Sequence, residues 1–390
     1  MAPASDDRAL NLSSPAARDK GSRETLARWL VGLLSGPVAL LIAQLAGAFP
    51  AQTEAVYGQR VGPWLGWLLA RSTGWFSFSL AEWLLAAAIL FWLLRWGRAL
   101  RADARLRALG RATLLNLRDL SVVLALFTLV FGIQYRRPPL TERMGWTDPI
   151  PADLLRTCAA ASVAEVNGLY RQLHRSDDLG RPTALERDFR SLDHALQDAW
   201  PDVATEFRLG AAAGWNRGRT KGLLISPLLA RLGLSGFYFP WTGEANRNRE
   251  VPAVRQPHVA AHEMAHQRGV AREDEANFLG WAVARRSDSR LARYSAAMYA
   301  HRRFLIELLR RDPEFARELI DARLPGVQRD VDDLHAYWAR HRGRGTRVSR
   351  SINDRYLRSH AIHDGTASYS RSLELMLRYA AASGRALPHP

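Results

Sequence analysis

A long run without a single charged side chain, residues 29–49, constrains the fold of this chain more than any other feature. The run reads WLVGLLSGPVALLIAQLAGAF. As a helix rising about 1.5 Å per residue, it reaches roughly 30 Å, the thickness of the hydrocarbon core of a bilayer. It is too long for the apolar region of a signal peptide, and no small-residue cleavage site follows it. We therefore expect a retained membrane-spanning helix.

Two further apolar runs follow the first. Residues 75–94 are interrupted only by Glu82, and residues 114–135 carry Arg118 and Asp119 near their start. A long arginine side chain near the end of a span can reach the lipid headgroups, so Arg118 does not exclude a span. The sequence thus predicts three transmembrane helices.

The distribution of basic residues predicts how these spans are oriented. Only Arg60 and Arg71 lie between the first and second runs, whereas the two flanking segments are rich in arginine. Basic loops stay in the cytoplasm, so the chain after Tyr135 is predicted to lie outside the cytoplasmic (inner) membrane. The basic residues expected on the cytoplasmic side are Arg8, Arg18, Lys20, Arg23, Arg28, Arg95, Arg98, Arg101, Arg105, Arg107 and Arg111.

The pattern divides the chain into three regions. Residues 1–25 are polar and charged and are predicted to form a disordered cytoplasmic tail. Residues 26–136 form the transmembrane region, and residues 140–382 form a predominantly helical extracytoplasmic domain. The fold class is therefore mostly α, with a small strand element. Apolar residues at helical spacing predict soluble helices at 151–173 and near 184–199, 289–311, 325–341 and 366–380.

Two segments each leave two interpretations open. The stretch GFYFPWTGEAN, residues 236–246, opens with aromatic residues that favour strands and closes with turn residues. Its residues 237–239 form either an edge strand, on which an extended peptide adds its backbone, or a core strand. Between the first two spans, residues 55–71 carry Trp64 and Trp67 and form either an interfacial helix or a buried loop helix.

Composition excludes some classes of site. The formal net charge of +16 comes almost entirely from arginine, because Lys20 and Lys221 are the only lysines. No basic run is interleaved with aromatic residues as a nucleic-acid groove would be, so we do not expect a nucleic-acid partner. The single cysteine, Cys158, excludes an intramolecular disulfide framework and a cysteine-rich zinc cluster.

The sequence HEMAH, residues 262–266, fits the H-E-x-x-H pattern. Positions i and i+4 share one face of a helix, so both imidazoles can reach one metal ion, and Glu263 lies beside that face to orient a water molecule. Pro257 suits the first turn of such a helix and Gly269 suits its end. The alternative is a polar helix whose histidines face solvent.

A catalytic zinc site needs a third protein ligand, and the acidic cluster after the motif offers candidates. Arg272 cannot serve, which leaves Glu273, Asp274 and Glu275. A helix that starts near Arg272 and folds back after the Gly269 turn favours Glu273, with Glu275 as the alternative. Asn277 is a candidate hydrogen-bonding partner on the same face. The residues expected to face the core are Phe278, Leu279 and Trp281.

Several motifs in order resemble a known bacterial membrane family, domain of unknown function 3810. They are FPWTGEANRN, HEMAHQRG, REDEANFLG, NDRYL and DGTASYSR, and the resemblance spans roughly residues 30–380. Residues 273–277 also match the E-x-x-A-[D/N] element of gluzincin-type metallopeptidases, whose first glutamate binds zinc. The resemblance implies a zincin-like C-terminal domain that holds Zn²⁺. Only six residues separate His266 from Glu273, a shorter gap than in most gluzincins.

These observations together predict a membrane-anchored zinc metallopeptidase. Its substrate would be a protein or peptide outside the cytoplasmic membrane, with Glu263 as the catalytic base and the bilayer as its other partner. The alternative is a non-catalytic, zinc-stabilised membrane scaffold or sensor, and the sequence leaves the oligomeric state open. His258, one helical turn before His262, is expected to be a partly exposed histidine at the helix start, with a supporting contact to the metal ligands as the alternative. The candidate transition-state donors are Tyr238, Arg355, Tyr356 and Tyr369.

Overall fold

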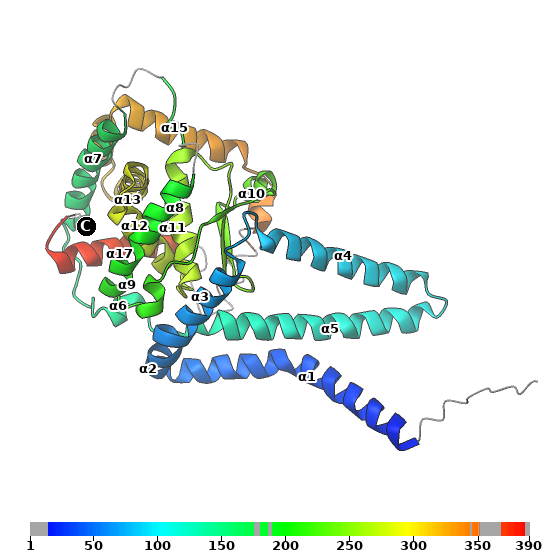
Figure 1. Ribbon diagram of the computed structural model, residues 1–390. Coiled ribbons are helices and arrows are strands. Elements are labelled where there is room, and N and C mark those ends of the chain that lie inside the picture. The colour runs from blue at the N-terminus through cyan, green and yellow to red at the C-terminus, as the bar shows by residue number, and fades with distance from the viewer. Residues whose placement is uncertain are drawn as a thin grey trace, which may run out of the picture. The chain divides into compact units, whose positions relative to one another are not determined.

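The computed structural model describes residues 15–174, 180–185, 189–343, 345–349, 351 and 368–386. The chain divides into two compact units, one of residues 1–42 with 90–128 and one of residues 43–89 with 129–390. The fold is mostly α-helical, as the sequence predicts (Figure 1).

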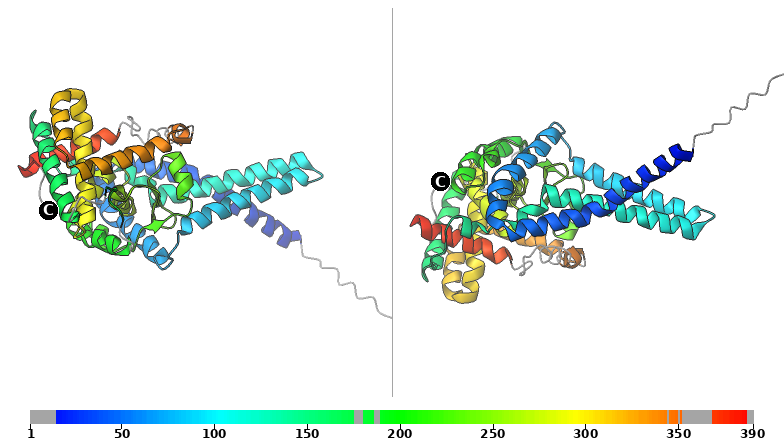
Figure 2. Two further views of the ribbon diagram at one scale, coloured as in Figure 1. Left: turned by 90° about the horizontal axis from the view of Figure 1, so that it is seen from above. Right: turned by 90° about the horizontal axis from the view of Figure 1, so that it is seen from below.

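Among the residues that the structure describes, three helices are long and apolar enough to cross a membrane, as predicted. They are α1 (Pro15–Ala48), α4 (Leu80–Arg101) and α5 (Arg105–Val130). The bounds differ from the prediction: the second helix starts at Leu80 rather than Trp75, and the third ends at Val130. Beyond Val130 the chain tightens into the short 3₁₀ helix η2 (Gly132–Arg136). Side by side, α4 and α5 are joined by a short turn (Figure 2).

Polar groups inside these apolar helices find partners within their own unit. Pro37 lacks a backbone N–H and therefore leaves the carbonyl of Leu33 without its helical donor. The Ser121 hydroxyl of α5 donates to that carbonyl at 2.6 Å and accepts from the Gly36 N–H at 2.9 Å. Asp119 pairs at 2.7 Å with Arg95 of α4 and at 2.8 Å with its neighbour Arg118. The carbonyl freed by Pro37 and the carboxylate of Asp119 thus both have partners.

The segment between the first two candidate spans is part of the larger unit. It consists of α2 (Pro50–Thr53), the π-helix η1 (Glu54–Val61) and α3 (Gly62–Thr73). One face of α3 is made of small buried residues, and a Cβ at Gly66 would lie 2.7 Å from the carbonyl oxygen of Gln267. This close approach supports the buried loop helix for that face, although the Trp64 side chain remains 47% exposed.

The remaining chain is a helical domain with one small sheet. Its helices are α6 (Leu140–Arg143), α7 (Leu154–Leu173), α8 (Phe189–Asp198), α9 (Trp200–Glu206), η3 (Ala211–Gly214), α10 (Ser226–Leu232), η4 (Ala253–Arg255), α11 (Gln256–Gln267), α12 (Glu273–Arg286), α13 (Arg290–Arg311), α14 (Pro313–Asp321), α15 (Pro325–Arg340) and α17 (Ser368–Ser383). The predicted soluble helices are all present. In contrast, α9, α10 and α14 were not predicted. A start signal for α14 is nevertheless present, because Asp312 caps the N–H of Phe315 just before Pro313.

The sheet has three strands, β1 (Lys221–Gly222), β2 (Gly236–Phe239) and β3 (Glu244–Arg247), in the order β1-β3-β2. The strand pairs β1–β3 and β3–β2 are parallel and antiparallel, respectively. Among the described strands β2 therefore lies at an edge, which agrees with the edge-strand interpretation. The prediction of a turn at residues 244–246 is wrong, because these residues belong to the central strand β3. The turn lies at residues 240–243, where Gly243 has a φ of 67°.

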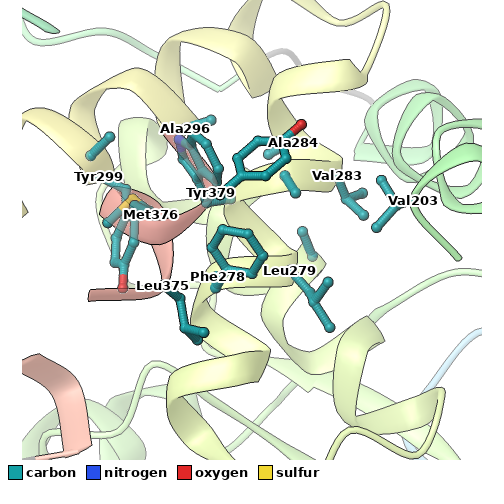
Figure 3. Close-up of a cluster of buried hydrophobic side chains, with 14 of the residues drawn as sticks. Val203, Phe278, Leu279, Val283, Ala284, Ala296, Tyr299, Leu375, Met376 and Tyr379 are labelled. Carbon is teal, nitrogen blue, oxygen red and sulfur yellow. The ribbon is translucent and has the colours of Figure 1, made fainter. Parts of the chain in front are cut away.

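The hydrophobic core fixes one face of α12. Phe278, Leu279 and Trp281 are at most 1% exposed, as predicted, and they pack among side chains of α13 and α17 (Figure 3). Full burial of one such side chain contributes about 1.5–3 kcal/mol. The opposite side of this helix, at its N-terminal turn, faces α11.

Candidate metal centre

Helix α11 carries the H-E-x-x-H motif, and its two ends explain why it forms here. Pro257 lies in the first turn, where its missing N–H costs no hydrogen bond. Gly269 follows the helix with a φ of 83°, a left-handed conformation that glycine adopts without strain. The chain reverses at this glycine and enters α12 at Glu273, so the two helices pack against each other (Figure 1).

The two motif histidines turn their ring nitrogens toward each other. The Nε2 atoms of His262 and His266 lie 3.1 Å apart, with the ring planes 89° to each other. The Nδ1 of His266 lies 2.6 Å from the carbonyl oxygen of Val270. This hydrogen bond orients the ring, and metal-binding histidines usually make such a bond with the nitrogen that does not face the metal. The Nδ1 of His262 is buried and has no such partner among the described residues.

Glu273 brings a carboxylate to both rings. Its Oε2 lies 3.3 Å from the Nε2 of His262, and its Oε1 lies 3.5 Å from the Nε2 of His266. As the first residue of α12 it sits at the positive end of the helix dipole, which favours the ionised carboxylate.

The alternative ligand, Glu275, is engaged elsewhere. Its Oε1 accepts from the backbone N–H of Leu140 at 2.7 Å, and its Oε2 accepts from Arg143 at 3.2 Å. Of the two predicted candidates, the structure therefore brings Glu273, and not Glu275, to the histidines.

The donor set fits a tetrahedral divalent ion. Two ligands bound at roughly 2.0–2.1 Å to one tetrahedral Zn²⁺ lie roughly 3.3–3.4 Å apart. Here the two histidine Nε2 atoms lie 3.1 Å apart, and two different oxygens of Glu273 lie 3.3 and 3.5 Å from them. One donor atom each from His262, Glu263 and His266 also lie within 4.8 Å of one another, so distance alone admits either glutamate as third ligand. Glu273 is the candidate whose two oxygens approach both rings.

Glu263 lies beside the donor set, against the sheet. The side chain is 4% exposed, and a Cβ at Gly236 of β2 would lie 2.8 Å from its Oε1. Gly236 thus leaves the space that the carboxyl group occupies. Burial raises the pKa of Glu263 to about 8, while His266 lowers it and Glu273 raises it. A carboxyl group with a pKa near neutral can both accept and return a proton.

The charges of the three ligand candidates are coupled. Burial disfavours charge on all of them, and it dominates at His262, whose pKa is lowered. At His266 the Glu273 carboxylate outweighs burial and raises the pKa to about 9. At Glu273 the two histidines outweigh burial and lower the pKa. A proton on His266 therefore takes the place that a divalent cation would fill, and acidification is expected to weaken metal binding.

Two predicted accessory residues behave differently from expectation. The Asn277 side chain donates to the backbone carbonyl of Glu273 at 2.7 Å, so it supports the first turn of α12 and not the carboxylate itself. His258 is 1% exposed, which corrects the prediction of a partly exposed histidine. Its ring stacks on Tyr299 at 3.8 Å between centroids, because the start of α11 is covered by α13.

Of the candidate transition-state donors, the structure describes the side chain of Tyr238. Tyr238 lies two residues after Gly236 on β2, so both point to the same side of the strand, toward α11. Its ring centroid is 5.2 Å from that of Phe131, which in turn is 6.2 Å from that of His266. Burial raises the pKa of Tyr238, so its hydroxyl keeps its proton and remains a donor. Arg355, Tyr356 and the Tyr369 side chain lie outside the described residues.

Comparison with known families now adds to this geometry. The family model described as "Protein of unknown function (DUF3810)" matches residues 57–377. The chain belongs to this family. The match includes all of the metal-centre residues and confirms the family resemblance seen in the sequence motifs. No curated protein and no solved structure matches the chain.

Gly280 of this DUF3810 member has a role that the sequence analysis missed. A Cβ on Gly280 of α12 would lie 2.9 Å from the backbone nitrogen of His262 and 3.1 Å from its Cα. The missing side chain therefore permits the close crossing of α11 and α12 that brings Glu273 to the histidines. A signal was present, because a glycine inside a helix costs about 1 kcal/mol and often marks close packing.

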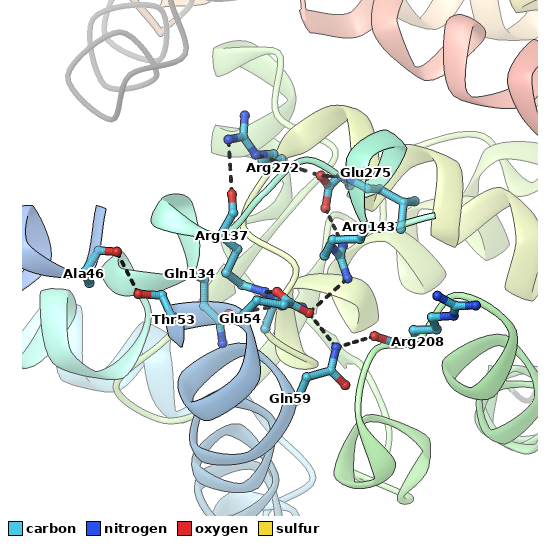
Figure 4. Close-up of polar contacts among 12 residues, drawn as sticks. Ala46, Thr53, Glu54, Gln59, Gln134, Arg137, Arg143, Arg208, Arg272 and Glu275 are labelled. Carbon is cyan, nitrogen blue, oxygen red and sulfur yellow. Dashed lines mark hydrogen bonds and ion pairs between the residues drawn. The ribbon is translucent and has the colours of Figure 1, made fainter. Parts of the chain in front are cut away.

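A buried ion network connects the turn between α11 and α12 to the segment between the first two candidate spans (Figure 4). Arg137 donates to Glu54 of η1 at 2.5 Å and to the carbonyl of Gly269, at the end of α11, at 3.1 Å. Arg143 lies 3.5 Å from Glu54 and 3.2 Å from Glu275 of α12. Glu54 therefore compensates two buried guanidinium groups, and the network holds both ends of the turn between α11 and α12.

Replacing Glu54 with glutamine should destabilise this DUF3810 member by about 1–2 kcal/mol. The amide keeps part of the hydrogen bonding but removes the negative charge beside two buried arginines. Burial opposes ionisation of Glu54, yet Arg137 and Arg143 lower its pKa, so the charge is present at neutral pH. The measurement is the thermal unfolding of the detergent-purified variant. Glu142→Gln, a nearby carboxylate outside the network, is the control, and equal unfolding temperatures of the two variants would contradict this account.

Proposed function

We propose that this DUF3810 member is a membrane-anchored, zinc-dependent metallopeptidase that hydrolyses peptide bonds of a protein or peptide at the outer face of the cytoplasmic membrane. The single observation that carries the proposal is the convergence of His262, His266 and Glu273, with the buried carboxyl of Glu263 beside them. In this proposal the fold of the helical domain is zincin-like, with the metal helix next to an edge strand.

The chain's own residues account for the proton transfers of such a reaction. A bound Zn²⁺ would polarise the scissile carbonyl and lower the pKa of an attacking water. Glu263 would accept the proton of that water and pass it to the leaving amine. The Tyr238 hydroxyl is the described candidate that donates a hydrogen bond to the developing oxyanion.

The edge strand β2 supports a polypeptide as the substrate. Its partner β3 occupies only one side of it, in antiparallel pairing from Gly236 to Phe239. An extended peptide that adds to the free edge would run past the strand whose Gly236 contacts Glu263. Recognition through the backbone positions the scissile bond and leaves the side-chain preference to the surrounding pockets.

The predicted topology supports the location. Arginine is concentrated at the turn between the second and third candidate spans, which supports a cytoplasmic location of that turn and of the N-terminus. With three spans, the helical domain would then lie on the outer face.

Metal analysis of the purified full-length chain tests the proposal. We expect near-stoichiometric zinc in the wild type, its loss in His262→Ala and Glu273→Gln, and its retention in Glu275→Gln, the matched control for charge. Chelation should stop peptide cleavage and added zinc should restore it. Retention of zinc by Glu273→Gln together with its loss from Glu275→Gln would show that the third ligand is assigned wrongly. Absence of zinc from every preparation would end the proposal.

A further inference from the structure

Three exposed apolar side chains lie together where α10 begins. Leu224, Ile225 and Leu228 are 63%, 37% and 52% exposed, respectively. Leu223 and Leu229 of the same segment are buried and hold it on the helical domain. Single exposed apolar residues are common on protein surfaces, whereas a group of them marks a contact surface or a membrane surface. The start of α10 therefore presents an apolar surface that needs a partner.

This segment is bonded to the first turn of α4, a candidate membrane span. The backbone N–H of Ile225 donates to the Oε1 of Glu82 at 2.9 Å, and Figure 1 shows the start of α10 beside the start of α4. Glu82 is the residue that interrupts the second apolar run of the sequence, and its carboxylate has a partner here. The start of α10 therefore lies at the depth at which α4 enters the membrane.

The start of α4 is also bonded to the sheet, within the same compact unit as α10. The buried carboxylate of Glu244 in β3 accepts from the backbone N–H groups of Leu80 at 3.1 Å and Ala81 at 2.8 Å. Just before α4, the Thr73 hydroxyl donates to the carbonyl of Thr242 at 2.8 Å. These bonds fix the depth of α10 relative to the first turn of the span.

Aromatic side chains mark the level of the membrane surface around the start of α4. The rings of Phe76, Phe78 and Trp83 follow one another, with centroids 5.5 Å and 6.4 Å apart. Trp75 is 81% exposed, and the guanidinium of Arg71 lies 5.9 Å from its ring. Tryptophan is enriched where a span meets the headgroups, and a long arginine side chain reaches them. The apolar surface of α10 is thus continuous with an aromatic belt, which identifies lipid as its partner.

We infer that Leu224, Ile225 and Leu228 insert into the bilayer at the boundary between headgroups and acyl chains, beside the first turn of α4. Interfacial segments bury their apolar face about 5–10 Å into this boundary. Strand β1 ends at Gly222, two residues before Leu224, so the contact holds the sheet close to the membrane surface. The inference rests on α4 crossing the membrane, and it is independent of the proposed metal chemistry.

Spin-label accessibility of the full-length chain in lipid nanodiscs tests this inference. A nitroxide is attached through Leu228→Cys, in a Cys158→Ala background that removes the buried native thiol. The nanodiscs contain phosphatidylcholine and phosphatidylglycerol. Molecular oxygen concentrates in hydrocarbon and a neutral nickel chelate concentrates in water, so the ratio of their effects on the label reports its depth. We expect the label at position 228 to lie about 5–10 Å inside the headgroup boundary.

Leu309→Cys is the matched control, because Leu309 is 45% exposed on α13, a helix that packs against α7 and α14. A label there should be more accessible to the nickel chelate than to oxygen. The same preference for the nickel chelate at position 228 would overturn the inference. Protection of position 228 from both reagents would also overturn it, since a second copy or another protein would then cover the segment in place of lipid.

Discussion

Replacing Glu263 with glutamine should lower peptide hydrolysis by about 10²–10⁴-fold while the protein keeps its zinc. Glutamine has almost the same shape as glutamate, so it fills the space left by Gly236 and leaves the two histidines in place. It cannot accept a proton, however, and the attacking water then lacks its base.

The measurement combines zinc content with cleavage of a mixed peptide library by the purified chain. Glu142→Gln serves as the control, since it removes an exposed carboxylate outside the ion network and away from the histidines. Complementation of a null strain with the Glu263→Gln variant distinguishes a hydrolytic role from a scaffold or sensor role. If the zinc-loaded variant restores the phenotype as fully as the wild type, hydrolysis is not the role of this site, and a zinc-stabilised scaffold or sensor takes its place.

Local spacing was enough to predict the helix that carries the motif. Pro257, the four-residue separation of the histidines, and Gly269 are features of one short segment, and each limits the backbone independently of the rest of the chain. The apolar runs were equally informative, since the three candidate spans follow from length and composition. Only their ends were misplaced, because a run of apolar residues does not show where a helix gives way to a 3₁₀ turn.

The sequence alone could not show which of Glu273 and Glu275 points toward the histidines, because this depends on tertiary contacts. Both residues lie in the first turn of α12, and their side chains point in different directions around it. Contacts with residues far away in the sequence decide these directions. The Glu275 carboxylate accepts hydrogen bonds from Leu140 and Arg143, whereas the Glu273 side chain points toward α11. No pattern within the acidic cluster reveals a partner more than a hundred residues away.

The same limit applies to the strand at 244–246 and to the ion network. The residues of that strand read as a turn because glutamate, alanine and asparagine disfavour strands, yet pairing with β1 and β2 on both sides outweighs propensity. Glu54 reads as an ordinary polar residue in a loop, and its importance comes from Arg137 and Arg143. In both places the tertiary contacts, and not the local sequence, decide the structure.

Gly280→Val should separate α11 from α12 and remove both zinc binding and hydrolysis. The new side chain would meet the backbone of His262, at 2.9 Å from its nitrogen, and backbone inside a packed helix pair cannot move aside as a flexible side chain does. Overpacking of this kind costs about 1–3 kcal/mol of stability. A displacement of His262 relative to Glu273 by about 1 Å lowers hydrolysis by about 10²-fold.

Gly168→Ala is the matched control for this substitution, because Gly168 is also inside a helix, α7, but its Cβ would meet nothing within 4 Å. Alanine there should stabilise the protein by up to about 1 kcal/mol through helix propensity alone. Thermal unfolding, zinc content and cleavage rate of the two variants form the comparison. A Gly280→Val protein that folds, binds zinc and cleaves peptides like the wild type would mean that the helix crossing does not set the site. Loss of zinc in a variant that still unfolds cooperatively, beside an unaffected Gly168→Ala, would identify the crossing as what holds Glu273 at the histidines.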